Sequence, residues 1–255
     1  MSFLFNEIVY RPLYNLLIFI YNIMPWSDFG IAIILVTIII KFLLIPLSRK
    51  QIESQKKMQI MQPEIKKIQE KYKNDKEKQS RALMEFYKTN KANPLSGCLP
   101  IIFQLIFLIA IYRVLFNISE AGLIVKGEEL YAFVSNPGQI NQTFLGIINL
   151  AKSMDLSHLA FSSIPHILLV VAAAAAQYFQ TKMLMPKQAS SSDSSKADMA
   201  QMMSKQMLYL GPFLTLFIGI KFPAGLALYW LVSTVFAIIQ QSKLAKEPEK
   251  KKITS

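Results

Sequence analysis

Long apolar runs separated by polar and charged segments dominate the pattern along this 255-residue chain. A helix of about 20 apolar residues is long enough to cross the hydrocarbon core of a bilayer, and it satisfies its own backbone hydrogen bonds there. The fourth run is short and contains Gly211-Pro212, so we expect a kink in it. The pattern predicts an all-α polytopic membrane protein with five transmembrane helices, over residues 29–47, 98–116, 164–183, 207–220 and 222–239.

Residues 1–28 form a less regular apolar segment. Its polar interruptions leave no uninterrupted stretch long enough to span a bilayer, and no small-residue cleavage site follows it. We therefore expect an amphipathic helix that lies in the membrane interface. An uncleaved signal anchor and a cleaved signal peptide remain as alternatives.

The charges of the connecting segments predict the orientation. Residues 48–93 hold 13 Lys/Arg and 6 Asp/Glu, the segment 186–206 holds 3 Lys, and the tail 240–255 holds 5 Lys. Residues 117–163 hold only 2 Lys and 4 acidic residues. Because cytoplasmic segments carry the excess of Lys and Arg, we expect the three basic segments inside, and the N-terminus and the loop 117–163 outside. The serine-rich segment 186–206 is expected to be a flexible loop, and the tail a basic extension.

The basic segment 48–93 also shows a helical period. Spacings of three and four predict a helix with one apolar stripe, which Pro63 kinks or restarts. The Lys73-Asn74-Asp75 turn then leads into a second helix over about 75–89, for which Asn74 and Glu77 form a weak capping box. We predict an antiparallel hairpin whose apolar residues are Met58, Met61, Ile65, Ile68 and Tyr72 in the first arm and Leu83, Phe86 and Tyr87 in the second.

The composition excludes several classes of protein. A hydrophobic content of 53% with a net charge of +12 is unusual for a soluble domain. The single cysteine excludes an internal disulfide, and His158 and His166 are too few and too badly spaced for zinc. No P-loop, HExxH or GxSxG motif occurs. We therefore expect no metal, no cofactor and no enzymatic activity.

A small set of polar residues lies within the predicted spans, and it contains no carboxylate. Lys41 would cost roughly 2.5–3.5 kcal/mol at the centre of a span unless it snorkels or meets water. The absence of a carboxylate disfavours ion-coupled transporters, which usually depend on one. Each polar residue alone has an ordinary interpretation as a helix–helix contact. Together they suggest a hydrated groove lined by Lys41, Thr37, Gln104, Gln177, Trp230 and Ser233.

Several motifs resemble the YidC/Oxa/Alb family of membrane-protein insertases, in the bacterial form without the large extracytoplasmic domain. The strongest runs from Asn93-Pro-Leu-Ser-Gly-Cys-Leu-Pro100 through Gln104, and the second is Phe222-Pro-Ala-Gly-Leu-Ala-Leu-Tyr-Trp230, continuing to Gln240-Gln241. Weaker matches are Glu70–Asp75, Met84–Lys88 and Asp155-Leu-Ser157. The resemblance covers about 29–244 in family order.

The resemblance implies five core helices around a hydrophilic groove that is open to the cytoplasm and the lipid but closed outside. By position, the basic residue of the groove falls on Lys41, its glutamine on Gln104 and its aromatic residue on Trp230. The family usually has arginine where this chain has Lys41, so bidentate contacts to carboxylates are in doubt while the charge is kept. The hairpin is expected to be mobile and to recruit substrates.

The sequence therefore predicts an insertase and chaperone for membrane proteins in the bacterial cytoplasmic membrane. Its expected partners are nascent membrane proteins and phospholipid, with the Sec translocon, the ribosome and the signal recognition particle system as further candidates, and no DNA. An assembly scaffold without insertion activity cannot be separated from an insertase by sequence. A small-solute channel or transporter is the remaining alternative, and the missing carboxylates disfavour it.

Overall fold

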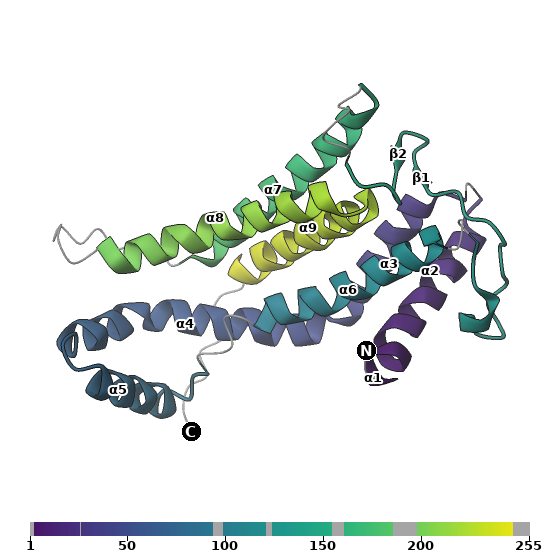
Figure 1. The fold of residues 1–255 in the computed structure, drawn as a ribbon. Helices are drawn as coiled ribbons and strands as arrows, with labels where there is room; N and C mark the ends of the chain where they lie inside the picture. Colours follow the sequence, from purple (N-terminus) through teal and green to yellow (C-terminus); the bar gives the residue numbers. More distant parts are fainter. Residues whose placement is uncertain are drawn as a thin grey trace.

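The computed structural model describes residues 3–25, 27–93, 99–120, 124–154, 161–185 and 198–246, which form an almost entirely helical molecule (Figure 1). Four long helices, α3, α6, α7 and α9, run along one another with α8 beside them, and α4 and α5 extend from one end (Figure 1). The predicted all-α membrane architecture is confirmed. Within the described ranges, strand is confined to one short hairpin and one isolated bridge.

The chain begins with a helical segment made of α1 (Phe3–Phe5), the π-helical η1 (Asn6–Tyr10) and α2 (Arg11–Ile23). Pro12 lies in the first turn of α2, where its missing N–H is tolerated. One face of α2 is buried in the core through Leu13, Leu17 and Ile18. The segment packs mainly against α3 (Phe29–Leu43) and, through η1, against α6 (Leu99–Glu120).

Helix α3 begins at a cap and ends at a sharp bend. The Asp28 carboxylate accepts the Ile31 N–H at 3.0 Å, which satisfies one free donor of the first turn. After Leu44 the chain continues as α4 (Ile45–Lys71), bent by 67° from α3. Pro46 lies in the first turn of α4 and has no N–H to bond the carbonyl of Phe42, so α3 ends four residues before the predicted end of the first span.

The two-helix hairpin predicted for residues 48–93 is present. Helix α4 continues through Pro63 without restarting, and α5 (Lys76–Thr89) folds back against it. Met61 and Ile65 are buried, whereas the apolar residues of α5 are at most half-buried. The predicted Asn74–Glu77 capping box is wrong, since Asp75 caps α5 by accepting the Lys78 N–H at 3.0 Å. Hydrogen bonds from the Lys78 backbone and side chain lower the pKa of Asp75.

Helix α7 (Ile164–Leu184) packs against both α8 (Asp198–Lys221) and α9 (Ala224–Lys246). Helix α9 also packs against α3. A Cβ at Gly219 would lie 2.7 Å from Val170, so glycine is needed where α8 crosses α7. Beside it, His166 Nε2 lies 3.2 Å from the Gly219 carbonyl. Helix α8 continues through Pro212 and begins nine residues before the predicted start of the fourth span, within the segment predicted to be a loop.

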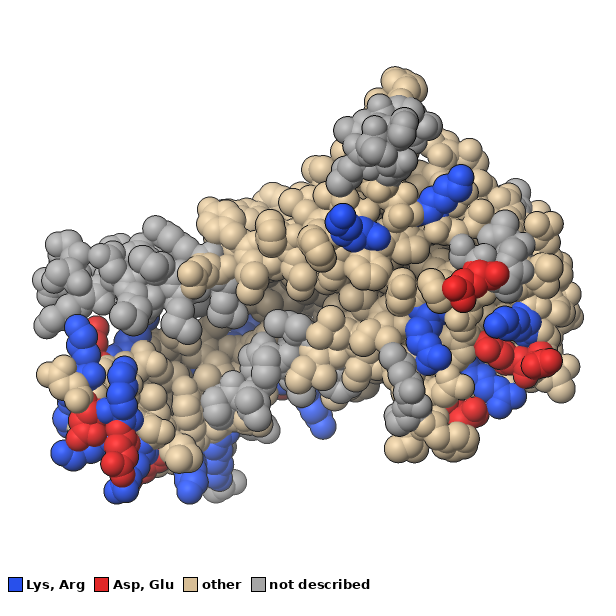
Figure 2. Space-filling model, in the orientation of Figure 1, with Lys and Arg blue, Asp and Glu red and all other residues tan. Residues whose placement is uncertain are grey.

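Three helices among the described residues are long and apolar enough to cross a membrane, namely 3–23, 164–184 and 224–244, and the bent pair α3–α4 could make a fourth. The expectation that polar residues leave no stretch of sufficient length in 1–28 is therefore wrong, because the helix continues through them over 3–23. Helices α6 and α8 carry shorter apolar stretches over 104–118 and 208–221. On the face seen in Figure 2, charged residues gather at the α4–α5 end and at the end around α2, with few between them. This distribution is typical of a protein with an apolar belt between two polar ends.

Residues 124–154 form a compact segment over the end of the bundle where α3 and α9 begin. It contains η3 (Gly127–Glu129) and an antiparallel hairpin of β1 (Thr143–Phe144) and β2 (Ile148–Asn149), and η4 (Phe161–Ser163) leads into α7. Leu150 is fully buried, and its carbonyl accepts the Gly225 N–H at 2.9 Å. These contacts fix the segment to the helix ends.

Some sequence predictions fall outside the described residues. These are the Pro94–Cys98 part of the strongest motif, Asp155-Leu-Ser157, His158, the loop residues 186–197 and the tail beyond 246.

Candidate functional site

A cluster of three polar side chains joins α3, α6 and α9. The Gln104 carbonyl oxygen accepts two hydrogen bonds, from Ser233 Oγ at 2.9 Å and from Lys41 Nζ at 3.4 Å. Ser233 is buried, while Lys41 and Gln104 are half-buried. These three predicted residues therefore meet at one point, although 63 residues separate Lys41 from Gln104 and 129 separate Gln104 from Ser233.

The amide nitrogen of Gln104 makes no hydrogen bond within this cluster. It is buried and finds no hydrogen-bond partner among the described residues. An unsatisfied buried amide costs about 1–3 kcal/mol, so a stable cluster needs water or another acceptor at this position. The cluster therefore offers a cation and an unused donor side by side, which together suit a carboxylate, a backbone carbonyl or water.

The other three predicted groove residues form their hydrogen bonds outside this cluster. Trp230 Nε1 donates to Gln177 Oε1 at 2.9 Å and links α9 to α7. Since Trp230 is one helical turn before Ser233, this pair lies next to the cluster along α9. The hydroxyl of Thr37 donates to the carbonyl of Ile33 in its own helix at 2.6 Å, and Thr37 is almost fully buried. The hydroxyl hydrogen of Thr37 is thus used within α3.

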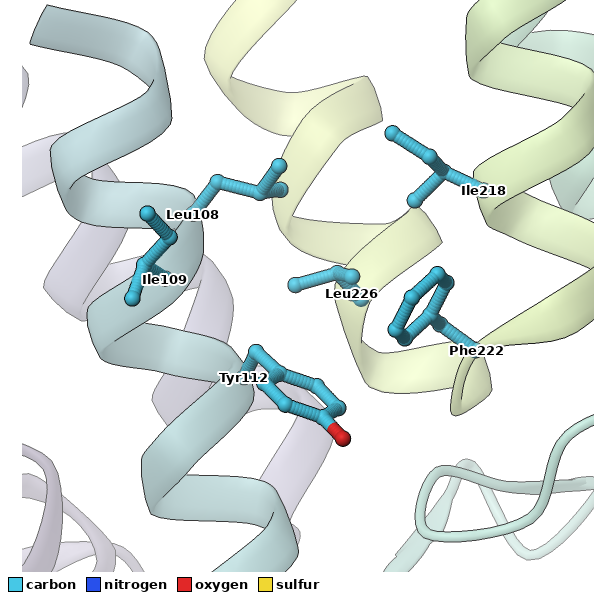
Figure 3. Close-up of a pocket in the computed structure, with 6 residues that line it drawn as sticks. All are labelled: Leu108, Ile109, Tyr112, Ile218, Phe222 and Leu226. Atoms are coloured by element: carbon cyan, nitrogen blue, oxygen red, sulfur yellow. The ribbon is translucent and has the colours of Figure 1, made fainter.

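An apolar depression of about 130 Å³ opens between α6 and the α8–α9 turn (Figure 3). Tyr112 and Phe222 meet edge to face across it, with ring centroids 5.3 Å apart. Its lining is apolar except for the hydroxyl of Tyr112, so it suits lipid chains or apolar side chains. The lining residues are Leu108, Ile109, Tyr112, Ile218, Phe222 and Leu226.

One turn of α4 caps the C-terminal ends of three other helices, and we call Lys56, Lys57 and Gln59 the capping turn. Lys56 Nζ donates to the Leu244 carbonyl in the last turn of α9 at 2.5 Å, and Gln59 Nε2 donates to the carbonyl at the end of α7. Lys57 Nζ donates to the carbonyl of Asn90 at the end of α5, also at 2.5 Å. Cations and donors are favourable at helix C-termini, where carbonyls lack partners. The capping turn thus holds the hairpin against the bundle.

The sequence interpretation passed over a second polar network at the opposite end. Tyr10 donates to Glu129 at 2.6 Å, and the side chain of Asn15 bonds both the carbonyl of Glu129 and the N–H of Tyr131. Arg113 lies over the ring of Tyr10, with 5.1 Å from its guanidinium carbon to the ring centroid. Arg113 was visible in the sequence as a charge in the second apolar run. Its aromatic partners, Phe5 and Tyr10, lie in the N-terminal helical segment, and no sequence motif indicates that this segment packs against Arg113.

No group of three or more His, Cys, Asp or Glu side chains that could hold a metal ion occurs among the residues described. The polar residues of the candidate site are amides, a hydroxyl, an indole and an ammonium, which are poor ligands for a resident metal.

Comparison with known proteins gives matches over most of the chain. The family model described as 60Kd inner membrane protein matches residues 19–251. Membrane protein insertase YidC of Fusobacterium nucleatum is 35% identical over 222 residues, which cover 87% of this chain and 88% of that protein. Membrane protein insertase YidC of Streptomyces avermitilis is 34% identical over 232 residues, covering 85% of this chain and 50% of that protein.

Other relatives are longer than this chain. Membrane protein insertase YidC of Citrifermentans bemidjiense is 32% identical over 92% of this chain, which spans 36% of that protein. The crystal structure of an active YidC insertase with its first transmembrane domain resolved matches 97% of this chain and 48% of its own, at 25% identity and a TM-score of 0.54. With the family model covering nearly the whole sequence, this chain belongs to the 60Kd inner membrane protein family.

Proposed function

We propose that this chain inserts membrane proteins into the bacterial cytoplasmic membrane and helps them to fold there. The observation that carries the proposal is the cluster of Lys41, Gln104 and Ser233, which combines a cation with a buried amide N–H that has no partner in the described part of the chain. Membrane protein insertase is also the printed name of the relatives that match most of this sequence.

The cluster acts by lowering the cost of bringing a polar segment partway into the membrane. A polar group that enters hydrocarbon without a partner costs several kcal/mol. Water and the side chains of Lys41 and Gln104 supply partners for such a segment, and the Lys41 charge attracts acidic residues in it. The apolar part of the substrate then gains a few tenths of a kcal/mol for each Leu or Ile at the centre of its span. Insertion therefore proceeds without a nucleotide or a covalent step, and the protein is not an enzyme.

The groove in this proposal is lined by the three clustered side chains and by Gln177 and Trp230. The Trp230–Gln177 bond holds α7 and α9 together beside the cluster, and the amide nitrogen of Gln177 donates to Thr181 Oγ1 at 3.4 Å within α7. The apolar depression at Tyr112 and Phe222 lies on the side of α6 that faces α8, where the apolar part of a substrate can lie.

The proposed topology has five spans, with the N-terminus outside and the C-terminus in the cytoplasm. The strongest support is the charge difference between the basic segment 48–93 and the nearly neutral segment 117–163. In this topology the segment 1–28 lies at the outer surface. The bonds from Asn15 and Tyr10 to the segment 124–154 favour that position over an isolated anchor helix, because they need both segments at one level.

The α4–α5 hairpin is proposed to recruit substrates and cytoplasmic partners. Ile60 and Met84 are 67% and 59% exposed on it, among many lysines, which gives a surface for both apolar segments and acidic or RNA-containing partners. The Sec translocon, the ribosome and the signal recognition particle system are the candidates.

Reconstitution of the purified chain into liposomes with a small single-span substrate tests the proposal. Insertion is measured as protection of the translocated tail from protease, against protein-free liposomes. Gln104→Leu, which removes the unpaired amide, should reduce insertion, whereas Gln139→Leu at an exposed side chain of the segment 124–154 should not. Insertion no better than in protein-free liposomes would favour the scaffold alternative. Leakage of a small dye from the same liposomes would favour the channel.

A further inference from the structure

The hairpin β1–β2 carries an unusual apolar tip. Leu145 and Gly146 are the central residues of a turn closed by the bond from Ile147 N–H to the Phe144 carbonyl at 3.0 Å. Both have positive φ, 51° and 70°, which is the pattern of a type I′ turn. Such turns favour Asn-Gly or Asp-Gly, because a bulky side chain is strained in the left-handed region. A leucine therefore occupies a position where a polar residue would be both less strained and better solvated.

The apolar side chains at this tip do not pack on the protein. Leu145 and Ile147 are 60% and 64% exposed, and no atom lies within 4 Å of the position that a Cβ on Gly146 would take. The two branched side chains on either side of Gly146 are thus mostly exposed. An exposed apolar tip on a strained backbone indicates a surface that something else covers.

The base of the hairpin fixes the level at which the tip lies. The N–H of Leu145 donates to Asp28 Oδ2 at 2.7 Å, and the other oxygen of the same carboxylate caps the first turn of α3. Phe144 packs so closely on Gly30 that a Cβ there would lie 2.3 Å from its ring. At the far side of the hairpin, the carbonyl of Lys152 accepts the N–H of Ala224, the first residue of α9, at 3.0 Å.

The backbone of the tip therefore bonds directly to Asp28, the residue that caps the start of a membrane helix. Helices of a membrane protein begin and end near the boundary between hydrocarbon and headgroups, so the tip lies at that boundary too. In Figure 1 the hairpin stands at this end of the bundle, beside the start of α3.

We propose that Leu145 and Ile147 insert into the lipid leaflet at this end of the bundle, which is the outer leaflet in the proposed topology. The bilayer is the occupant that the position favours, because the hairpin is bonded at the first residues of two apolar helices, where hydrocarbon gives way to headgroups. Transfer of the two side chains out of water offsets the strain of the Leu145 backbone. The hairpin thereby fixes the depth of α3 and α9 in the membrane.

Spin labels on a Cys98→Ser parent test this placement. Leu145→Cys and Ile147→Cys are labelled separately in vesicles of phosphatidylethanolamine and phosphatidylglycerol, and Gln139→Cys labels an exposed polar site of the same segment as the control. Collisions with oxygen, which concentrates in lipid, should be more frequent at 145 and 147 than at 139, and collisions with a water-soluble nickel chelate less frequent. Ile147 keeps the test valid if the label disturbs the turn at Leu145.

Two outcomes overturn the proposal. Equal nickel accessibility at the tip and at Gln139 would mean that the tip is in water. Protection of the tip from both reagents would mean that protein covers it, such as a second copy of this chain. Thermal unfolding that matches the Cys98→Ser parent is required of each labelled variant before its accessibility is compared.

Discussion

Neutralising Lys41 should impair the insertion of substrates with acidic translocated tails more than the insertion of substrates with neutral ones. Lys41→Gln keeps a polar side chain of similar reach and removes the charge, whereas Lys41→Arg keeps the charge and changes the head group. Because the proposed role of Lys41 is electrostatic, Lys41→Arg should retain most of the activity. Lys50→Gln on the exposed surface of α4 is the matched control for loss of one positive charge nearby.

The size of the effect follows from the geometry of the cluster. Lys41 Nζ lies 3.4 Å from the Gln104 amide, and a carboxylate bonded to that amide would lie about 6 Å from the ammonium. At this separation the attraction is about 0.7 kcal/mol in bulk water and about 2.8 kcal/mol at an effective dielectric constant of 20. These limits correspond to a rate ratio between roughly 3-fold and 100-fold. The assay must therefore resolve a threefold difference.

The assay uses liposomes and two substrates that differ only in the tail, one with aspartates and one with asparagines at the same positions. The measured quantity is the ratio of the two initial insertion rates, since a general loss of activity cancels in it. Lys41→Gln should lower the ratio, and both Lys41→Arg and Lys50→Gln should leave it near that of the unchanged chain. An unchanged ratio in Lys41→Gln, with both rates lowered together, would refute the electrostatic role.

Three further results are expected. Gly219→Val should destabilise the chain by about 1–3 kcal/mol through overlap with Val170, and thermal unfolding in detergent should show partial recovery in the double variant with Val170→Ala. Lys56→Met should loosen the hairpin by about 1 kcal/mol, seen as faster hydrogen exchange in α4 and in the last turn of α9 with no change in α2. Hydrogen bonding lowers the pKa of Asp75 in the folded chain, so the Asp75 cap stabilises α5 fully above the unfolded pKa, and this stabilisation is lost as pH falls through the folded pKa. Circular dichroism should therefore show a loss of helix at acidic pH in the unchanged chain that is missing from Asp75→Ala.

The apolar period predicted the helical architecture, and the rare polar residues predicted a cluster of which three members meet in the structure. Lys41, Gln104 and Ser233 stood out because polar groups are costly in apolar runs, and they meet in the structure. Thr37 lies one turn from Lys41 in sequence, yet its hydroxyl bonds its own helix. A sequence gives the face of a helix to within about a turn, whereas hydrogen bonding depends on rotamers and on how each helix is rotated against its neighbours.

Hydrogen bonds from side chains to the backbone of distant segments could not be predicted from the sequence. In the sequence the capping turn is only part of the basic segment 48–93, but Lys56 and Gln59 bond carbonyls of α9 and α7 that no residue type marks. The hairpin at residues 143–149 was missed because Leu145-Gly146 lacks the Asn-Gly signature of its turn. In both places the structure depends on long-range geometry that overrides the local signal.

The structure also changes the energetics of Lys41. The insertion cost of roughly 2.5–3.5 kcal/mol applies to a lysine at the centre of a span, whereas Lys41 lies in the last turn of α3, just before a bend of 67°. A cation there is stabilised by the negative end of the helix by about 0.3–1 kcal/mol, and Gln104 supplies an acceptor. Because part of the cost of the charge is offset in this way, the unpaired amide of Gln104 becomes the stronger reason to expect water between α3, α6 and α9.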